Sequence, residues 1–325
     1  MNIIVVPYSS TDFNRWNDFV QEAKNATFLF RREFMAYHQD RFVDASLMLY
    51  KNNVLVAILP ANVVGDLMVS HGGLTYGGLL CLKVVKMKEY LAYWKAVLKH
   101  LNANGIERIQ LKELPRMYNR FCSEELDYMV FITKGHCFRT DVLSVIEQSN
   151  KLPVSKKRMA SINKGFSLGF YVEEEQSFEC FWRDVLIPNL KEKHGVSPVH
   201  SLEEIEKLHA LFPKEIRQFN LYNNENMLIA GVTVFETDLV AHVQYISGLK
   251  SWNDMGAVDW LHHYLIEVVF KEKQYFDFGS SNEVGGRKLN DGLLFWKESF
   301  GARTMVQNFY EIETKQYKQF QEVWN

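Results

Sequence analysis

The chain has 325 residues, of which 47% are hydrophobic and 23% are charged, a length and composition that allow two globular domains with buried cores. The formal net charge of −2 excludes a general attraction to DNA or to an anionic membrane surface, and no apolar run is long enough to insert into a bilayer. The four cysteines lack the spacing of a zinc site and are typical of free thiols in a reducing compartment, so we expect a cytoplasmic protein without a bound metal.

The first half of the sequence alternates between helical and strand patterns, which is typical of an α/β protein. We expect these elements in chain order: an N-terminal strand, helices starting at Ser10 and spanning 32–39, strands over 45–50 and 54–61, a long helix over 86–104 and a strand over 106–111. Asn52-Asn53 joins the two central strands and favours a tight hairpin. A glycine-rich stretch, SHGGLTYGGLL, covers residues 70–80 and precedes the long helix.

The second half repeats this order of elements. We expect helices over 156–168, 178–193 and 202–212, strands over 218–222, 227–236 and 240–248, a long helix over 256–273 and a strand over 275–278. The segment YNNENMLIA at 222–230 resembles YKNNVLVA at 50–57, and a long helix and a short strand follow both segments. This agreement in residues and in order indicates an internal duplication.

The duplication and a polar linker around 147–154 predict two domains, 1–150 and 151–325. The last segment, 314–324, predicts an amphipathic helix with Tyr317, Phe320 and Trp324 on one face. An apolar helix face has to be covered, so we expect residues 314–325 to return to the first domain.

The strongest local motif is YFDFGSSNEVGGRKLNDGLLFWKESFGA at 275–302, in which a strand ends at D-F-G and a short helix ends with W-K-E-S-F-G. This motif resembles the C-terminal motif of the Fem-type aminoacyltransferases of bacteria and their acetyltransferase-like (GNAT-like) relatives. KKRMASINKG, SHGGLTYGGLL and ATFLFRREFMAYH are similar to further segments of that family. The sequence departs from the family at Trp296, where the family has Phe, at the Gly-Gly-Leu that replaces Arg-Gly-Pro, and in lacking a coiled-coil arm.

The resemblance implies an α/β fold of two tandem GNAT-like domains with mixed sheets, the first binding the acceptor and the second carrying the donor and the catalytic groups. It implies transfer of an acyl group, with acyl-CoA (acetyl-CoA) as co-substrate, to the amine of an amino sugar or another cell-envelope or polysaccharide precursor. The acceptor would be a small molecule or a nucleotide- or lipid-linked saccharide. Two alternatives stay open: an aminoacyl-tRNA-dependent peptidyltransferase acting on a peptidoglycan precursor, and a catalytically inactive GNAT pair that serves as a binding module.

In a GNAT fold the pyrophosphate of CoA lies at the start of the helix that follows the fourth strand, where backbone N–H groups and the helix dipole hold it. The corresponding stretch is Asn253, Met255, Gly256, Ala257 and Val258, of which only Gly256 matches the family pattern well. The stretch is equally compatible with an ordinary capped helix start.

Three residues are candidates for catalysis. Lys297 would stabilise the negative charge that develops during acyl transfer, with a solvated helix lysine as the alternative. Asp277, at a strand end, would accept a proton from the acceptor amine or hold the amine, with an aspartate that caps the following loop as the alternative. Tyr245 on the strand 240–248 would act as a general acid, with a core tyrosine as the alternative reading. For substrate binding we expect Gln244 on the same strand, together with three residues of the first domain: Arg31, His71 and Tyr76.

Overall fold

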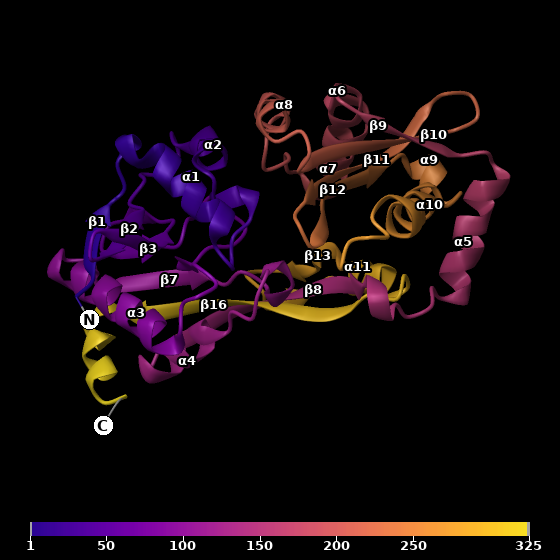
Figure 1. Ribbon diagram of the computed structural model, residues 1–325. Coiled ribbons are helices and arrows are strands. Elements are labelled where there is room, and N and C mark those ends of the chain that lie inside the picture. Colours follow the sequence, from indigo (N-terminus) through magenta and orange to yellow (C-terminus); the bar gives the residue numbers. More distant parts are fainter. Residues whose placement is uncertain (1, 324–325) are drawn as a thin grey trace. The chain divides into compact units, whose positions relative to one another are not determined.

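The structure, a computed structural model, describes residues 2–323 and divides into two compact units (Figure 1). The first unit comprises Met1–Asp141 and Val306–Asn325, and the second comprises Val142–Met305. Two strands, β8 (His136–Glu147) and β16 (Arg303–Glu313), each continue from one unit into the other. Within residues 2–323, no helix has the length and apolar character that crossing a lipid bilayer requires.

The first unit combines two groups of hydrogen-bonded strands with one long helix. The strands are β1 (Ile4–Pro7), β2 (Leu47–Lys51), β3 (Val54–Leu59) and β6 (Leu80–Cys81) in one sheet, and β4 (Asn62–Val64), β5 (Leu67–Val69) and β7 (Arg108–Lys112) followed by β16 in the other. The helices are η1 (Ser10–Asp12), α1 (Phe13–Glu22), η2 (Phe28–Phe30), α2 (Arg32–Met35), η3 (Ala36–His38), α3 (Met87–Ala103), η4 (Arg116–Tyr118), α4 (Glu125–Ile132) and η8 (Thr314–Gln321).

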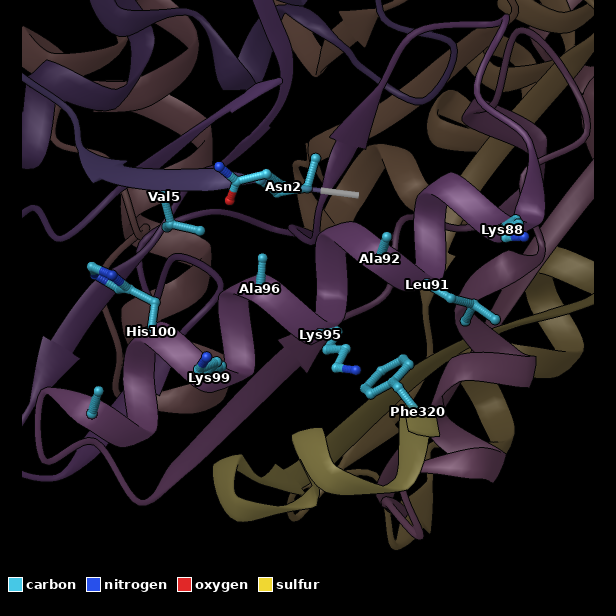
Figure 2. A pocket seen from close by; sticks show the side chains of 12 residues that line it. Asn2, Val5, Lys88, Leu91, Ala92, Lys95, Ala96, Lys99, His100 and Phe320 are labelled. Atoms are coloured by element: carbon cyan, nitrogen blue, oxygen red, sulfur yellow. The ribbon is translucent and has the colours of Figure 1, made fainter. Parts of the chain in front are cut away.

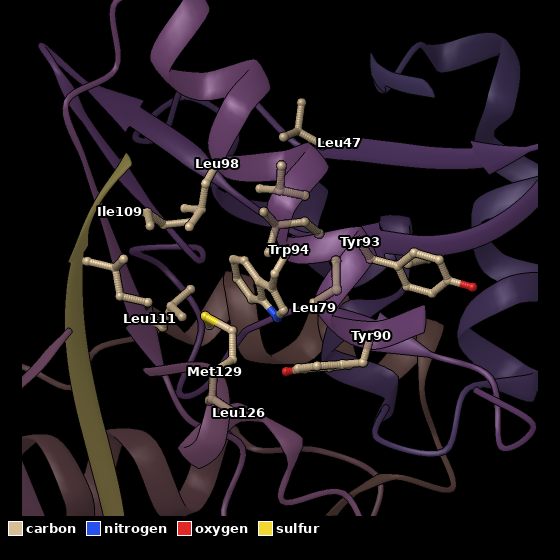
Figure 3. Packing of buried hydrophobic residues seen from close by; sticks show 14 of the residues in the cluster. Leu47, Leu79, Tyr90, Tyr93, Trp94, Leu98, Ile109, Leu111, Leu126 and Met129 are labelled. Atoms are coloured by element: carbon tan, nitrogen blue, oxygen red, sulfur yellow. The ribbon is translucent and has the colours of Figure 1, made fainter. Parts of the chain in front are cut away.

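Helix α3 organises the core of the first unit. Its apolar face presents Trp94 and Leu98, which recur at the spacing of one helical face and are fully buried together with Ile109 and Leu111 of β7 (Figure 3). Each such side chain stabilises the fold by about 1.5–3 kcal/mol relative to exposure. The C-terminal η8 packs on α3 and buries Phe320 in this core. Trp324, expected on the same helix face, lies outside the described residues.

The second unit is a mixed sheet with the strand order β8, β13 (Tyr275–Ser280), β12 (Val240–Gly248), β11 (Leu228–Glu236), β10 (Ile216–Tyr222) and β9 (Tyr171–Glu175). A separate small hairpin joins β14 (Asn282–Glu283) to β15 (Lys288–Leu289). The helices are η5 (Gln148–Asn150), α5 (Lys156–Ser167), α6 (Glu179–Phe181), η6 (Trp182–Leu186), α7 (Ile187–His194), α8 (Leu202–Leu211), α9 (Lys250–Asn253), α10 (Ala257–Tyr264), η7 (Leu265–Val269) and α11 (Asp291–Glu298).

The parallel pair in each unit repeats one arrangement. In the second unit, β12 and β13 pair through His242–Asp277, after which β13 continues beside β8 and β12 continues beside β11. We call the point of separation the second-unit fork. In the first unit, β5 and β7 pair in parallel through Val69–Gln110, the first-unit fork. A helix, α10 or α3, connects the two strands of each parallel pair, and an antiparallel hairpin precedes each pair, as the internal duplication predicts.

Candidate active site

Asp277 lies at the second-unit fork and is held by two hydrogen bonds. Its Oδ2 is 2.8 Å from Nδ1 of His242, and its Oδ1 accepts the backbone N–H of Gly279 at 2.7 Å. The side chain is 2% exposed. Both carboxylate oxygens are engaged inside the protein, an arrangement that fits a positioning role. The direct role of Asp277 as proton acceptor stays a prediction.

His242 is the partner that the sequence did not reveal. A carboxylate only accepts hydrogen bonds, so Nδ1 of His242 donates to Asp277 and a neutral ring carries its lone pair on Nε2. The side chain is 18% exposed, so the ring is partly reachable while its orientation is fixed. The contact joins residues that are 35 positions apart, and it depends on the register of a parallel strand pair, which has no local sequence signal.

Lys297 binds the backbone carbonyls of the turn at Gly279. Its Nζ donates to the carbonyl oxygens of Gly279 at 2.9 Å and Ser280 at 2.8 Å, and the residue is 4% exposed. Burial lowers the pKa of Lys297 to about 8, and the charge of Asp277 opposes this shift. The lysine expected at this place is thus a buried ammonium near Asp277.

The burial of α11 is unusual for an amphipathic helix. Lys297 is the buried residue of this helix, whereas Leu293 is exposed. The reason is that Lys297 takes the inward position, one turn after Leu293, from which its ammonium reaches the two carbonyls. Phe300, just beyond the helix, is buried and packs edge-on against Trp296.

Tyr245 and Gln244 lie beyond the fork on β12. Thr233 of β11 faces Tyr245 and Val234 faces Val243, so Gln244 is the extra residue of a β-bulge, a feature that re-aims side chains. The backbone N–H of His200 donates to the phenol oxygen of Tyr245 at 3.1 Å, and Nδ1 of His200 lies 2.6 Å from the same oxygen. The phenol oxygen of Tyr245 is therefore held by His200, a second partner that the sequence did not indicate.

The stretch expected to hold pyrophosphate starts α10, but one side of it is closed. Gly256 has φ +83°, and a Cβ at this position would lie 2.3 Å from the carbonyl oxygen of Ser161 in α5. The absence of a side chain at Gly256 thus allows α10 to pack on α5, and the predicted contact of this stretch with pyrophosphate stays a prediction. Asn253 donates to the carbonyl of Gly248 at 3.1 Å, which ties the preceding turn to β12. Among the remaining members of this stretch, Met255 is exposed, Val258 half-buried and Ala257 buried.

The three first-unit residues expected to bind the acceptor have different surroundings. Arg31 is exposed and pairs with Glu33 at 3.0 Å. His71 is buried with φ +69°, and burial lowers its pKa to about 3. Tyr76 is buried, and its hydroxyl donates to Oγ1 of Thr27 at 2.9 Å. Of the three, Arg31 has the accessible side chain.

A hollow of about 560 Å³ lies elsewhere in the first unit, where β1, α3 and η8 meet (Figure 2). Its wall includes Lys95 and Ala96 of α3 and Phe320 of η8. None of the predicted acceptor residues Arg31, His71 and Tyr76 lines it. The hollow and the expected acceptor site are therefore different places in this unit.

No protein-family model and no curated protein matches the sequence. Solved structures do match, and together they define the fold as a tandem pair of GNAT-like domains. FemX has a TM-score of 0.67 and 9% identity over 99% of this chain and 100% of that one. L-PGS from Bacillus licheniformis has a TM-score of 0.59 and 12% identity over 94% and 91%.

A tandem GNAT protein from the clavulanic acid biosynthesis pathway has a TM-score of 0.51 and 9% identity over 96% of this chain and 99% of that one. The fold class expected from the motif at 275–302 is therefore confirmed, and so is the structural likeness to a Fem-type protein. At such identities the likeness establishes the fold, and an activity has to be argued from the site.

Proposed function

We propose that the chain is an acyltransferase that moves an acyl group from acyl-CoA, such as acetyl-CoA, to the amine of an amino sugar or another cell-envelope or polysaccharide precursor. One observation carries the proposal: the Gly279 turn joins the Asp277 carboxylate and the Lys297 ammonium at the second-unit fork. Open α/β sheets bind ligands where neighbouring strands diverge, so a donor and an acceptor would meet at this fork.

Lys297 supplies positive charge in this proposal. Acyl transfer places negative charge on the carbonyl oxygen in the transition state, and a fixed donor there stabilises it strongly. Two of the three N–H groups of the ammonium hold the carbonyls of Gly279 and Ser280, which fixes the direction of the third. We assign that third N–H to the carbonyl oxygen of the donor.

The donor would lie along the start of α10, with the backbone N–H groups of Ala257 and Val258 facing its phosphates. Gln244, the bulge residue of β12, would contact the acyl group, and Tyr245 would return a proton to the leaving sulfur through its hydroxyl. Arg31, His71 and Tyr76 remain the proposed acceptor-side residues of the first unit.

The test is a thermal-shift titration of the full chain with acetyl-CoA, CoA and UDP-linked amino sugars, followed by a transfer assay with labelled acetyl-CoA. A ligand at 100 times its dissociation constant stabilises the folded state by about 2.7 kcal/mol, which gives a clear rise in Tm. Binding of acetyl-CoA with transfer of label to an amine supports the proposal. Transfer from aminoacyl-tRNA without CoA binding would support the Fem-type alternative, and binding without transfer would support the inactive module.

A further inference from the structure

We infer that His242 is the general base that removes the proton from the acceptor amine, and that Asp277 is the residue that positions it. The inference rests on the proposed acylation of an amine and names the group that makes the amine nucleophilic. It starts from the hydrogen bond between Nδ1 of His242 and Oδ2 of Asp277 at the second-unit fork.

The hydrogen bond sets the tautomer of the imidazole. Asp277 is almost completely buried and holds its other oxygen on the N–H of Gly279, so the carboxylate cannot turn away from the ring. With Nδ1 donating, the lone pair of the neutral ring is on Nε2, the nitrogen pointing away from the carboxylate. The partly exposed side chain of His242 then offers a fixed proton acceptor next to the Gly279 turn, which Lys297 holds from its carbonyl side.

Gly279 explains why the D-F-G sequence accompanies this pair. Its N–H donates back to Asp277 in an Asx-type turn, and its φ of +72° lies in the left-handed region that favours glycine. A Cβ on Gly279 would lie 3.2 Å from Cε1 of His242, so a side chain at this position would press on the imidazole. The same residue gives its carbonyl oxygen to Lys297. One glycine therefore connects the base, the carboxylate and the ammonium.

Other histidines of this unit are arranged differently. His262 is fully buried, donates from Nδ1 to the carbonyl of Val258 and stacks on Phe278, so its ring belongs to the core. His200 is buried and engaged with the hydroxyl of Tyr245. His242 combines a carboxylate partner with a partly exposed ring, the combination that general-base catalysis requires.

The step balances as follows. The acceptor enters as an ammonium, and Nε2 of His242 takes one proton, which leaves a neutral amine and an imidazolium paired with Asp277. The nitrogen lone pair then attacks the donor's carbonyl carbon and forms the C–N bond, and the C–S bond breaks with its electron pair going to sulfur. The nitrogen loses its extra proton and the thiolate gains one, so an amide, a thiol and a protonated base result.

The experiment compares the wild type with His242→Gln, Asp277→Asn and the double variant in the full chain, and His136→Gln, an exposed histidine, is the control. We expect His242→Gln to lower kcat by about 10²–10⁴ without weakening acetyl-CoA binding by more than about twofold. Asp277→Asn should approach the same loss because a carboxamide favours the wrong tautomer. The double variant should be no slower than His242→Gln, since residues of one unit are not additive.

The pH profile separates catalysis from structure. A general base makes kcat/KM fall on the acidic side, so the wild type should show an acidic limb that His242→Gln lacks. Asp277 on β13 contacts the ring, and the charge of Asp277 acts in turn on Lys297 of α11. Retention of the acidic limb and of normal kcat in His242→Gln would overturn the inference while the acyltransferase proposal stands.

A second measurement decides the geometry without turnover. Long-range nitrogen–proton NMR of the ¹⁵N-histidine-labelled protein should show His242 protonated on Nδ1 in the wild type and on Nε2 in Asp277→Asn. An Nε2–H tautomer in the wild type would refute the positioning by Asp277, even if the protein transfers acyl groups. Absence of transfer by the wild type to any amine would instead refute the proposed function and with it the base role, whatever the tautomer.

Discussion

At each of the two forks, a buried lysine donates hydrogen bonds to two backbone carbonyls of a glycine-containing turn. At the second-unit fork, Lys297 donates to the carbonyls of Gly279 and Ser280. At the first-unit fork, Nζ of Lys112 donates to the carbonyls of Gly72 and Leu74, both at 2.8 Å. Burial lowers the pKa of each lysine to about 8. A buried lysine that holds a glycine turn is therefore a structural feature of both units and does not by itself mark an active site.

The surroundings of the two lysines differ. Asp277 is the charged neighbour of Lys297, whereas Arg139 is that of Lys112. The segment after the first-unit fork is also tightly packed: a Cβ on Gly77 would lie 1.9 Å from the carbonyl oxygen of Ser70, and one on Gly73 would lie 1.9 Å from Nε2 of His38. The comparison teaches that a carboxylate and a partly exposed imidazole distinguish the second-unit fork.

The largest effect that tests this comparison is on turnover. Lys297→Ala should reduce kcat by about 10²–10³, the usual loss when one donor to a developing charge is removed. Lys112→Ala removes an equivalent pair of hydrogen bonds and should leave kcat within a few-fold of the wild type. Lys297→Arg should recover part of the rate, since a planar guanidinium does not replace a compact ammonium.

Unfolding in urea provides the control for both lysine variants. Each alanine variant leaves two carbonyl oxygens without their lysine donor, so each should lose a similar 1–3 kcal/mol, roughly, in the free energy of unfolding. Equal losses of kcat in the two variants would end the distinction between the forks and would make both lysines structural.

The next effect is on stability and concerns the glycines. Gly77→Ala should lower the free energy of unfolding by about 1–3 kcal/mol or more, because the added Cβ meets a backbone carbonyl that cannot move aside. Gly292→Ala in α11 is the matched control, since a Cβ there meets nothing closer than Oδ1 of Asn290 at 3.8 Å. Alanine should be neutral or stabilising at that helical position. If Gly77→Ala left the free energy of unfolding unchanged, the segment after the first-unit fork would not be tightly packed.

Gly256→Ala should destabilise the protein as Gly77→Ala does, unlike the control Gly292→Ala. The positive φ of Gly256 and the carbonyl of Ser161 at 2.3 Å predict a destabilised protein, whatever CoA does. Gly256→Asp is for the same reason a poor probe of CoA binding, because its side chain would disturb the packing on α5. Val258→Pro removes one N–H at the start of α10 and is the better probe, because proline is tolerated in a first helical turn.

A pH titration of stability probes the buried histidine of the first unit. The folded-state pKa of His71 is about 3, below the usual 6.5, because burial disfavours the charged ring. Between these values the unfolded chain binds more protons than the folded one, so the stability present above pH 6.5 is lost as the pH falls towards 3. The slope from one such group is at most about 1.4 kcal/mol per pH unit.

His71→Asn should flatten this slope, and asparagine tolerates the positive φ of the position. Burial lowers the pKa of His262 to about 4, so His262 adds a slope of the same sign in the second unit. Urea unfolding of both proteins at several pH values measures the difference. An unchanged slope in His71→Asn would mean that His71 is protonated in the folded state.

Periodic elements could be predicted from the sequence and short or non-local ones could not. β12 has the expected bounds, and α5 and α8 end within one residue of theirs, because their apolar spacing is regular. The strands β4 and β5 were not predicted, since three residues are too few for a period. The long β16 was also missed, although its pairing with β7 joins distant parts of the chain.

The same division applies to the site. Asp277 and Lys297 lie in one contiguous motif, so a resemblance in sequence was enough to select them. His242 and His200 entered only with the structure, because their partners are 35 and 45 positions away and depend on strand register and a loop. The glycines of 70–80 have the composition of a ligand loop, and only their contacts show that several of them face the protein's own atoms.

The smallest expected effect concerns Arg31, the accessible member of the first-unit residues assigned to the acceptor. Its guanidinium is 45% exposed and pairs with a Glu33 that is 25% exposed, so Arg31→Ala should change the free energy of unfolding by less than about 1 kcal/mol. If the first unit binds the acceptor, the KM for the amine should rise several-fold while kcat stays near its wild-type value, the pattern of a lost binding contact.

Arg183→Ala is the matched control, because Arg183 is 60% exposed and pairs with Glu179 in the second unit. A KM that responds to neither variant would remove Arg31 from acceptor binding, and a KM that responds equally to both would point to a general effect of surface charge. A response of Arg31→Ala alone would assign the acceptor to the first unit and leave the chemistry to the second.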